Sequence, residues 1–283
     1  METLLYTDNA KVTIRPNGPA VIIGERINPT GRKKLAAALE AGNLDYVVEL
    51  ATNQVAWGAD VLDVNVGVPG IDEVALLPQV VRLVASVVKT PICIDTPNHD
   101  ALAAALPVAP GKPLVNSVNG EEKALERVLP LVKDRGAAVI GLTMDDNGIP
   151  PSAEGRLAMA DKIITRATAL GIPIEDIIID PLVLTVGADS QAAALTLETI
   201  RLVREKFGVN INLGASNVSF GLPDRHTLNQ AFLALAIGQG ATCMITDPLK
   251  LTATIRAADL LLGRDNYAKR WVTFFRQHPP EAK

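Results

Sequence analysis

The sequence of 283 residues has only two cysteines, three histidines and 4% aromatic residues. Two cysteines cannot build a disulfide framework, and Cys93 and Cys243 both lie in apolar runs, so we expect buried, reduced thiols and a cytoplasmic protein. No apolar run approaches the roughly 18 residues of a membrane span, and the N-terminus lacks a basic-then-apolar signal pattern. The net charge of −4 argues against general binding of nucleic acid. The 48% of apolar residues suffices for the large core of a soluble globular enzyme.

Short runs rich in Val, Ile and Leu alternate with longer helical patterns, and this alternation occurs eight times. Nearly continuous apolar runs are typical of parallel strands that are buried on both faces. The predicted strands are residues 21–26, 61–66, 91–95, 113–117, 137–144, 176–180, 210–216 and 242–246. Between them apolar residues recur at three- and four-residue spacing, and Gly136, Gly171 and Gly208 fall where helices should end.

Eight strand–helix units without a break in composition predict one closed (β/α)8 TIM barrel, over residues 20–263. An open, doubly wound sheet is the structural alternative, and it would usually carry a glycine-rich phosphate turn after its first strand. The sequence from Glu25 to Gly31 is Glu-Arg-Ile-Asn-Pro-Thr-Gly, which is neither G-x-G-x-x-G nor a Walker motif. We therefore expect the barrel.

Two segments fall outside the eight units. Residues 1–19 form an N-terminal extension, in which residues 3–16 predict a β-hairpin around Asp8 and Asn9 that closes the barrel floor. Residues 264–283 predict a C-terminal helix and tail, with an aromatic stripe at positions i, i+4, i+7 and i+8. The stripe consists of Tyr267, Trp271, Phe274 and Phe275. Such a stripe fits a helix packed on the barrel wall, and it also fits a contact between subunits.

In TIM-barrel enzymes the active site lies at the carboxyl ends of the strands, and here a polar side chain lies at or just after the end of every predicted strand. In chain order these are Glu25 and Asn28, Asp63 and Asn65, Asp95, Asn116 and Asn119, Asp145, Asp180, Ser216 and Asn217, and Asp247. Any one of them could be a helix N-cap, since Asp and Asn are favoured there. Their recurrence around the whole ring favours a functional site instead.

The residue types at the strand ends narrow the chemistry. No lysine ends a strand, which argues against a Schiff-base enzyme, and the three dispersed histidines predict no metal site. No Ser–His–Asp arrangement is evident. A carboxylate accepts two N–H groups side by side, and a carboxamide both donates and accepts. A ring that alternates the two suits a flat heterocycle such as a reduced pterin, whose N3–H and 2-amino groups form a paired donor edge.

At these positions the sequence resembles the pterin-binding barrels that include the methyltetrahydrofolate:corrinoid protein methyltransferases. The matching segments are GERIN at 24–28, LDVNVG at 62–67, CID at 93–95, VNS at 115–117, GLTM at 141–144, IDP at 179–181 and GASNV at 214–218. They follow strands one to seven in order, so the resemblance spans the chain from about residue 20.

This resemblance implies that Asp95, Asn116 and Asp180 bind the pterin ring and that Asn217 lies near its N5 atom. It implies further that Gly214 and Ser216 shape the loop around Asn217, and that the enzyme is a homodimer. Glu25, Asp63 and Asn65 complete the predicted substrate-binding set.

The expected reaction moves a methyl group between N5 of tetrahydrofolate and the cobalt of cobalamin. Because an amide anion is a very poor leaving group, N5 must gain a proton or a strong hydrogen bond as the C–N bond breaks. Asn217 is the predicted donor. The barrel uses the whole chain, so the cobalamin must be carried by a separate corrinoid protein, and the sequence leaves the direction open.

Two alternatives remain at this stage. The first is a non-catalytic folate-binding subunit of a methyltransferase complex. The second is a dihydropteroate synthase, which resembles this family but carries basic residues after strands seven and eight. Here those places hold Ser216-Asn217-Val218 and Thr246-Asp247-Pro248, which do not suit an anionic leaving group.

Overall fold

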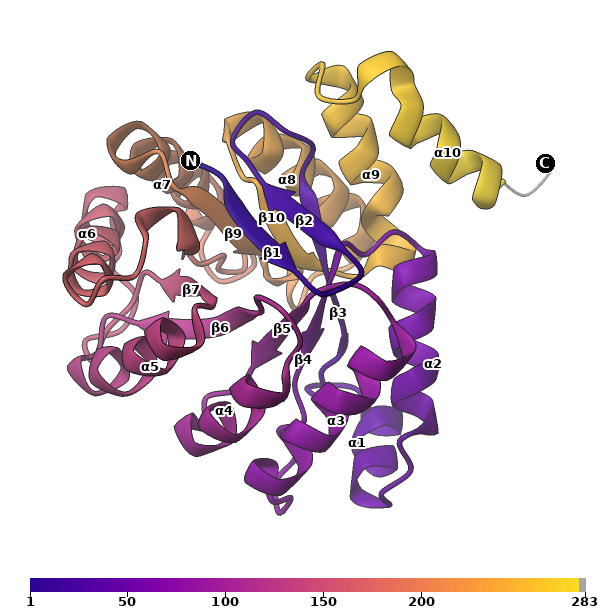
Figure 1. The fold of residues 1–283 in the computed structure, drawn as a ribbon. Coiled ribbons are helices and arrows are strands. Elements are labelled where there is room, and N and C mark those ends of the chain that lie inside the picture. The colour runs from indigo at the N-terminus through magenta and orange to yellow at the C-terminus, as the bar shows by residue number, and fades with distance from the viewer. Residues whose placement is uncertain (280–283) are drawn as a thin grey trace.

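A computed structural model describes residues 1–279, and its centre is a closed barrel of eight parallel strands (Figure 1). The strands are β3 (Val21–Ile27), β4 (Val61–Val64), β5 (Ile92–Asp95), β6 (Leu114–Asn119), β7 (Ala138–Leu142), β8 (Ile177–Asp180), β9 (Asn210–Gly214) and β10 (Cys243–Thr246). Each strand pairs with the next in the chain, and β10 pairs with β3 to close the ring. The predicted fold class is confirmed.

Helices follow the strands and surround the barrel (Figure 1). They are α1 (Lys33–Glu40), α2 (Asp45–Ala56), α3 (Glu73–Val87), α4 (His99–Ala105), α5 (Glu122–Arg135), α6 (Ala153–Ala169), α7 (Ala192–Phe207), α8 (Arg225–Gln239), α9 (Pro248–Leu261) and α10 (Lys269–Gln277). Gly136 and Gly208 end α5 and α7 in the left-handed conformation, with φ of 63° and 65°, as the sequence predicted. None of the described helices is long and apolar enough to cross a membrane.

Strand residues alternate between two apolar cores, because successive side chains of a strand point to opposite faces. Ile22, Leu62 and Ile94 belong to the outer core, which fills the space between strands and helices. Ile23 and Val61 belong to the inner core inside the barrel, together with apolar residues of the other strands. A residue two positions after an inward-facing residue therefore also points into the barrel interior. It lies one layer nearer the carboxyl end of the barrel.

The N-terminal hairpin closes the amino end of the barrel. It consists of β1 (Thr3–Tyr6) and β2 (Lys11–Ile14), and it lies across the ring of strands as the indigo segment of Figure 1. Leu5 and Ile14 are fully buried and complete the inner core. Asn210, at the start of β9, donates from Nδ2 to the Ile14 carbonyl at 3.0 Å. The predicted hairpin is thus confirmed, and it seals the barrel floor.

The C-terminal helix α10 packs beside α9, and only part of the aromatic stripe takes part. Phe274 is buried against Trp57, with ring centroids 6.3 Å apart. The Asp265 carboxylate accepts hydrogen bonds from the backbone N–H groups of Arg270 and Trp271, so the helix begins after Tyr267. Tyr267 is fully exposed with a φ of 55°, and its prediction as a helix residue is wrong. Residues 280–283 of the predicted tail lie outside the described part of the chain.

Candidate functional site

The carboxyl end of the barrel interior is lined by polar side chains from six strands. Each lies two residues after an inward-facing residue of the same strand, and together we call them the polar layer. Its members are Glu25, Asp63, Asp95, Asn116, Asp180 and Asn212. Five of the six were predicted from the sequence, and Asn212 was not. The strand period of two thus gathers carboxylates and carboxamides into one ring above the inner core.

Asp63, Asp95 and Asn116 form one hydrogen-bonded group on neighbouring strands. Asn116 donates from Nδ2 to Asp63 Oδ1 at 3.2 Å, and the Asp63 and Asp95 carboxyls share a hydrogen bond. Burial, and then the charge of Asp95, raise the pKa of Asp63 well above its ordinary value, and burial raises the pKa of Asp95 as well, so the pair tends to retain a proton between its two carboxyls.

Two further carboxamides orient Asp95. Asn65 donates from Nδ2 to Asp95 Oδ2 at 3.1 Å, and Asn28 donates to the same oxygen at 3.2 Å. Burial raises the pKa of Asp95, whereas these two donors lower it. Both carboxamides therefore donate to the same Asp95 oxygen, and Asp95 shares a further hydrogen bond with Asp63. Asn28 and Asn65, both predicted strand-end residues, act here as partners of a carboxylate.

Asp180 lies at the end of β8 and is 5% exposed. Its Oδ1 accepts from the Leu182 backbone N–H at 2.8 Å, and its Oδ2 accepts from Asn212 Nδ2 at 2.7 Å. Burial raises the pKa of Asp180 from 3.8 to about 6, although these hydrogen bonds oppose the shift. Among the described residues the buried Oδ1 of Asn212 has no hydrogen-bond partner, so the pair of Asp180 and Asn212 can accept a further polar ligand.

The turn after Asp180 is strained and firmly held. Leu182 has a φ of 63°, which is uncommon for a residue other than glycine. Arg156, a fully buried side chain of α6, donates from Nη1 to the carbonyls of Pro181 and Leu182, each at 2.9 Å. A strained backbone conformation of this kind persists only where surrounding contacts hold the residue in place. Arg156, which sequence reasoning missed, thereby fixes the turn that orients Asp180.

The segment after β9 is a short 3-10 helix, Ala215–Ser219, which carries Ser216 and Asn217. Asn217 is exposed at the mouth, and within residues 1–279 its carboxamide makes no hydrogen bond. A Cβ added to Gly214 would lie 3.2 Å from Asn217 Nδ2, so a side chain there would crowd the amide. Ser216 donates weakly from Oγ to Glu25 at 3.5 Å. Gly214 and Ser216 therefore border Asn217, as predicted.

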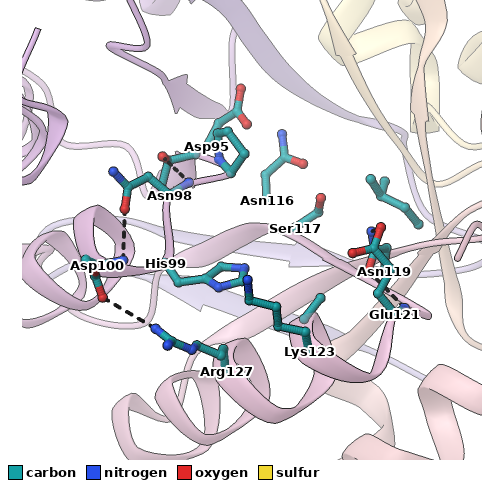
Figure 2. A pocket seen from close by; sticks show the side chains of 14 residues that line it. Asp95, Asn98, His99, Asp100, Asn116, Ser117, Asn119, Glu121, Lys123 and Arg127 are labelled. Carbon is teal, nitrogen blue, oxygen red and sulfur yellow. Dashed lines mark hydrogen bonds and ion pairs between the residues drawn. The ribbon is translucent and has the colours of Figure 1, made fainter. Parts of the chain in front are cut away.

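Two cavities open at the mouth. The larger has a volume of about 610 Å³ and is lined by Asp95 and Asn116 at one end and by residues of α4 and α5 at the other (Figure 2). The smaller, of about 220 Å³, is lined by Glu25 and Ser216 among others. Asp180 and Asn217 line neither cavity, so the structure does not place all predicted residues in one pocket.

Two predicted strand-end residues have local roles instead. Asp145 forms a tight turn, in which its carboxylate accepts from the Asn147 backbone N–H at 2.9 Å. Asp247 caps the first turn of α9 and pairs with Arg26 at 3.2 Å. Among residues 1–279 no group of three or more His, Cys, Asp or Glu side chains is arranged to hold a metal ion.

These features define a TIM barrel with a polar mouth, and comparisons with known proteins specify its family. The family model for pterin-binding enzymes matches residues 24–247. The methylcorrinoid:tetrahydrofolate methyltransferase of Eubacterium limosum is 31% identical over 265 residues, which cover 91% of this chain and 96% of that protein. The chain therefore belongs to the family of pterin-binding enzymes.

A second relative agrees with this assignment, and a solved structure shares the fold. Methionine synthase of Mycobacterium tuberculosis is 31% identical over 242 residues, which cover 81% of this chain but only 20% of that protein. The dihydropteroate synthase of Yersinia pestis matches 92% of this chain and 99% of its own chain with a TM-score of 0.71. At 16% identity that likeness shows the shared fold alone.

Proposed function

We propose that the protein is a methyltransferase that moves a methyl group between N5 of tetrahydrofolate and the cobalt of a separate corrinoid protein. The polar layer is the observation that carries this proposal, because it offers both acceptors and donors to a flat, nitrogen-rich ring. The relatives named as methyltransferases and methionine synthases act as independent support. Microscopic reversibility lets the same site serve either direction.

In this proposal Asp95, Asn116 and Asp180 bind the pterin. An ionised Asp180 accepts two N–H groups of the ring, and its neighbour Asn212 has a buried acceptor oxygen that no group within residues 1–279 satisfies. Asn116 now donates to Asp63, and its carboxamide can turn to a ring nitrogen when the pterin enters. Asp63 and Asn65 hold Asn116 and Asp95 through hydrogen bonds and complete the substrate-binding set together with Glu25, which lies beside Ser216.

Asn217 is the proposed catalytic residue. Breaking the bond between N5 and the methyl carbon requires stabilisation of charge that develops on N5, and a hydrogen bond that is stronger in the transition state provides it. Asn217 suits this role because it is exposed at the mouth without a partner in the described chain. A carboxamide is no acid, so the proton itself must come from solvent or from the protonated Asp63–Asp95 pair.

The corrinoid is a substrate delivered by its own protein, which docks over the mouth. We propose in addition that the enzyme works in the cytoplasm as a homodimer. The two buried, unpaired thiols suit a reducing compartment. Exposed apolar side chains near the C-terminal helix, including Leu261, Tyr267 and Val272, suit a subunit contact. Sedimentation equilibrium tests the dimer, and a single species of about 30 kDa would contradict it.

The decisive experiment mixes the protein with 5-methyltetrahydrofolate and free cob(I)alamin and follows the cobalt spectrum. Appearance of methylcobalamin at a rate proportional to enzyme concentration is expected. Tight folate binding without any transfer, in either direction, would instead identify a non-catalytic folate-binding subunit. Condensation of a pterin diphosphate with p-aminobenzoate would identify a dihydropteroate synthase, but Asn217 and Asp247 stand where anion-binding residues would be needed.

A further inference from the structure

The smaller cavity at the mouth differs from the rest of the protein in its charge. Its volume is about 220 Å³, and it is lined by four cationic side chains and two carboxylates, an excess of two positive charges in a chain of net charge −4. The cations are Arg26, Arg32, Arg225 and Lys250, the carboxylates are Glu25 and Asp247, and His226 also lines the wall. Such a local excess is a binding site for an anion.

Not all of these cations are engaged within the protein. Arg26 pairs with Asp247 at 3.2 Å, and Arg32 pairs with Glu25 at 3.4 Å. Within residues 1–279, in contrast, Lys250 Nζ and the His226 ring have no hydrogen bond or ion pair. Lys250 is exposed at the start of α9, where its ammonium can reach a ligand in the cavity.

An exposed aromatic ring connects Asn217 to this cavity. Phe220 is 68% exposed, and its backbone N–H donates to the Asn217 carbonyl at 3.1 Å. The guanidinium of Arg225 lies 5.7 Å from the centre of the Phe220 ring and donates to the Ser216 carbonyl at 2.7 Å. These contacts place the Phe220 ring and the Arg225 guanidinium beside the segment that carries Asn217, and Arg225 also lines the cationic cavity.

Folate carries groups that suit these side chains: the ring nitrogen N5, an aromatic ring and carboxylates. The tail is attached at C6, which is bonded directly to N5, and it consists of a p-aminobenzoyl ring followed by one or more glutamates. If N5 lies at Asn217, as the proposed function requires, the tail leaves the pterin on the side of Phe220 and Arg225. We propose, resting on that function, that Phe220 contacts the aminobenzoyl ring and that the cationic cavity binds the glutamate carboxylates.

The larger cavity is a poorer candidate for the same tail. Its cations Lys123 and Arg127 face three carboxylates, and Arg127 already lies 3.8 Å from Asp100. Figure 2 shows Arg127 and Asp100 joined in this way, at the end of the cavity away from Asn116. The remaining negative excess would repel a polyglutamate, so the charge distribution favours the smaller cavity.

The test compares three methyl donors that differ only in their tails: a 5-methyltetrahydropterin with a methyl group at C6, 5-methyltetrahydrofolate with one glutamate, and the same folate with three. KM is measured for each with free cob(I)alamin. We expect KM to fall along this series. The Lys250→Ala variant should reduce the preference for three glutamates over one by about threefold, the size of an exposed ion pair, and Lys250→Arg should restore it.

Two other variants separate the parts of the subsite. Lys89→Ala removes an equally exposed lysine at the opposite end of the barrel, and it should keep the wild-type preference. Phe220→Ala should reduce the preference for the monoglutamate over the tail-less pterin by about fivefold, as expected for loss of an aromatic contact. It should preserve the effect of glutamate number.

Equal KM values for one and three glutamates in the wild type would overturn the proposal, and so would a Lys250→Ala variant that behaves like Lys89→Ala. Absence of transfer with all three donors would refute the proposed function without deciding the subsite. In that case the dissociation constants of the three demethylated ligands decide it, with the same expected order and the same variants.

Discussion

The two ends of one barrel have opposite properties, and β9 shows the contrast within three residues. Asn210, at the floor, donates to the Ile14 carbonyl and to the Thr3 hydroxyl of the hairpin, so its amide joins two parts of the fold. Asn212, in the polar layer, donates to a carboxylate whose pKa is shifted to about 6. In a TIM barrel the amino end supplies stability and the carboxyl end supplies chemistry. Asparagine thus stabilises the fold at the amino end of β9 and belongs to the candidate site at the carboxyl end.

The largest predicted effect concerns the mouth. Asp180→Ala should weaken tetrahydrofolate binding at least about 1,000-fold, because it removes two hydrogen bonds from ring N–H groups to a charged acceptor. Isothermal titration calorimetry measures the affinity. Unchanged affinity would remove Asp180 from the site. Thermal unfolding of the variant serves as the control that the barrel is intact.

The Asn217→Ala variant tests whether binding and chemistry are separate within the mouth. Methyl transfer should slow by about 100-fold, as for loss of one donor to a developing charge, whereas the folate dissociation constant should change by less than about threefold. Single-turnover kinetics with cob(I)alamin measure the first, and calorimetry measures the second. Equal losses in both would mean that Asn217 acts on the ground state alone.

The Ile14→Ala variant tests the floor. Removing this fully buried side chain should lower the free energy of unfolding by about 3 kcal/mol. Denaturation by urea measures this loss. The folate dissociation constant of the folded variant should match the wild type, since the polar layer lies at the other end of the barrel. Weaker binding would show that the two ends depend on each other.

The pH dependence of folate binding can distinguish the two ends of the barrel, because each end holds a buried carboxyl group. Burial raises the pKa of Asp180 at the mouth and of Asp259 in α9 to about 6. Asp259 accepts from the Ala20 backbone N–H before β3. Only an ionised Asp180 accepts two ring N–H groups, so folate affinity should rise between pH 5 and 7 with a midpoint near 6. Asp259→Asn should keep this midpoint, and a shifted midpoint would contradict the assignment to Asp180.

The free energy of unfolding should fall as pH rises over the range in which folate affinity rises. A carboxyl whose pKa is raised on folding stabilises the folded state below its unfolded pKa of 3.8, and this stabilisation is lost as pH rises through about 6. Each of the two groups can contribute up to about 3 kcal/mol of this loss, of which about 2 kcal/mol falls between pH 4.5 and 7.5. Urea denaturation at pH 4.5 and 7.5 measures it, and Asp259→Asn should reduce the difference. A difference that stays as large in Asp259→Asn would remove Asp259 as a contributor.

The smallest effect is expected at Asp145, a mouth residue outside the polar layer. Its carboxylate closes a local turn with Asn147, so Asp145→Ala should change stability by no more than about 0.5 kcal/mol and leave folate affinity unchanged. Calorimetry and thermal unfolding measure both. A large loss of folate affinity in Asp145→Ala would contradict this prediction and would place Asp145 in the binding site.

The fold could be predicted almost entirely from the sequence, because buried parallel strands leave unmistakable apolar runs. The predicted strand at 137–144 became Ala138–Leu142, and such differences concern ends alone. The hairpin was equally readable. Tyr267 was misjudged because the Asp265 carboxylate, and not the aromatic spacing, determines where α10 begins.

The site could be predicted only where a polar residue ends a strand. Asn212 was overlooked because it lies inside an apolar strand, although its spacing of two from Asn210 was a usable signal. Arg156 comes from a helix distant in sequence, and nothing local marks its buried contacts with Pro181 and Leu182. Asp145 shows the converse case, since its carboxylate closes a local turn with Asn147 although its position after the strand suggested a shared role.

The closed floor has a consequence for the order of events during turnover. Within residues 1–279 the hairpin and the inner core fill the amino end, so a ligand reaches the polar layer through the mouth, and a corrinoid protein seated on the mouth would also block it. Under the proposed function, folate must therefore enter before its macromolecular partner arrives and can depart only after the partner has left. Steady-state kinetics should therefore show a compulsory order of binding, with folate as the first reactant to bind.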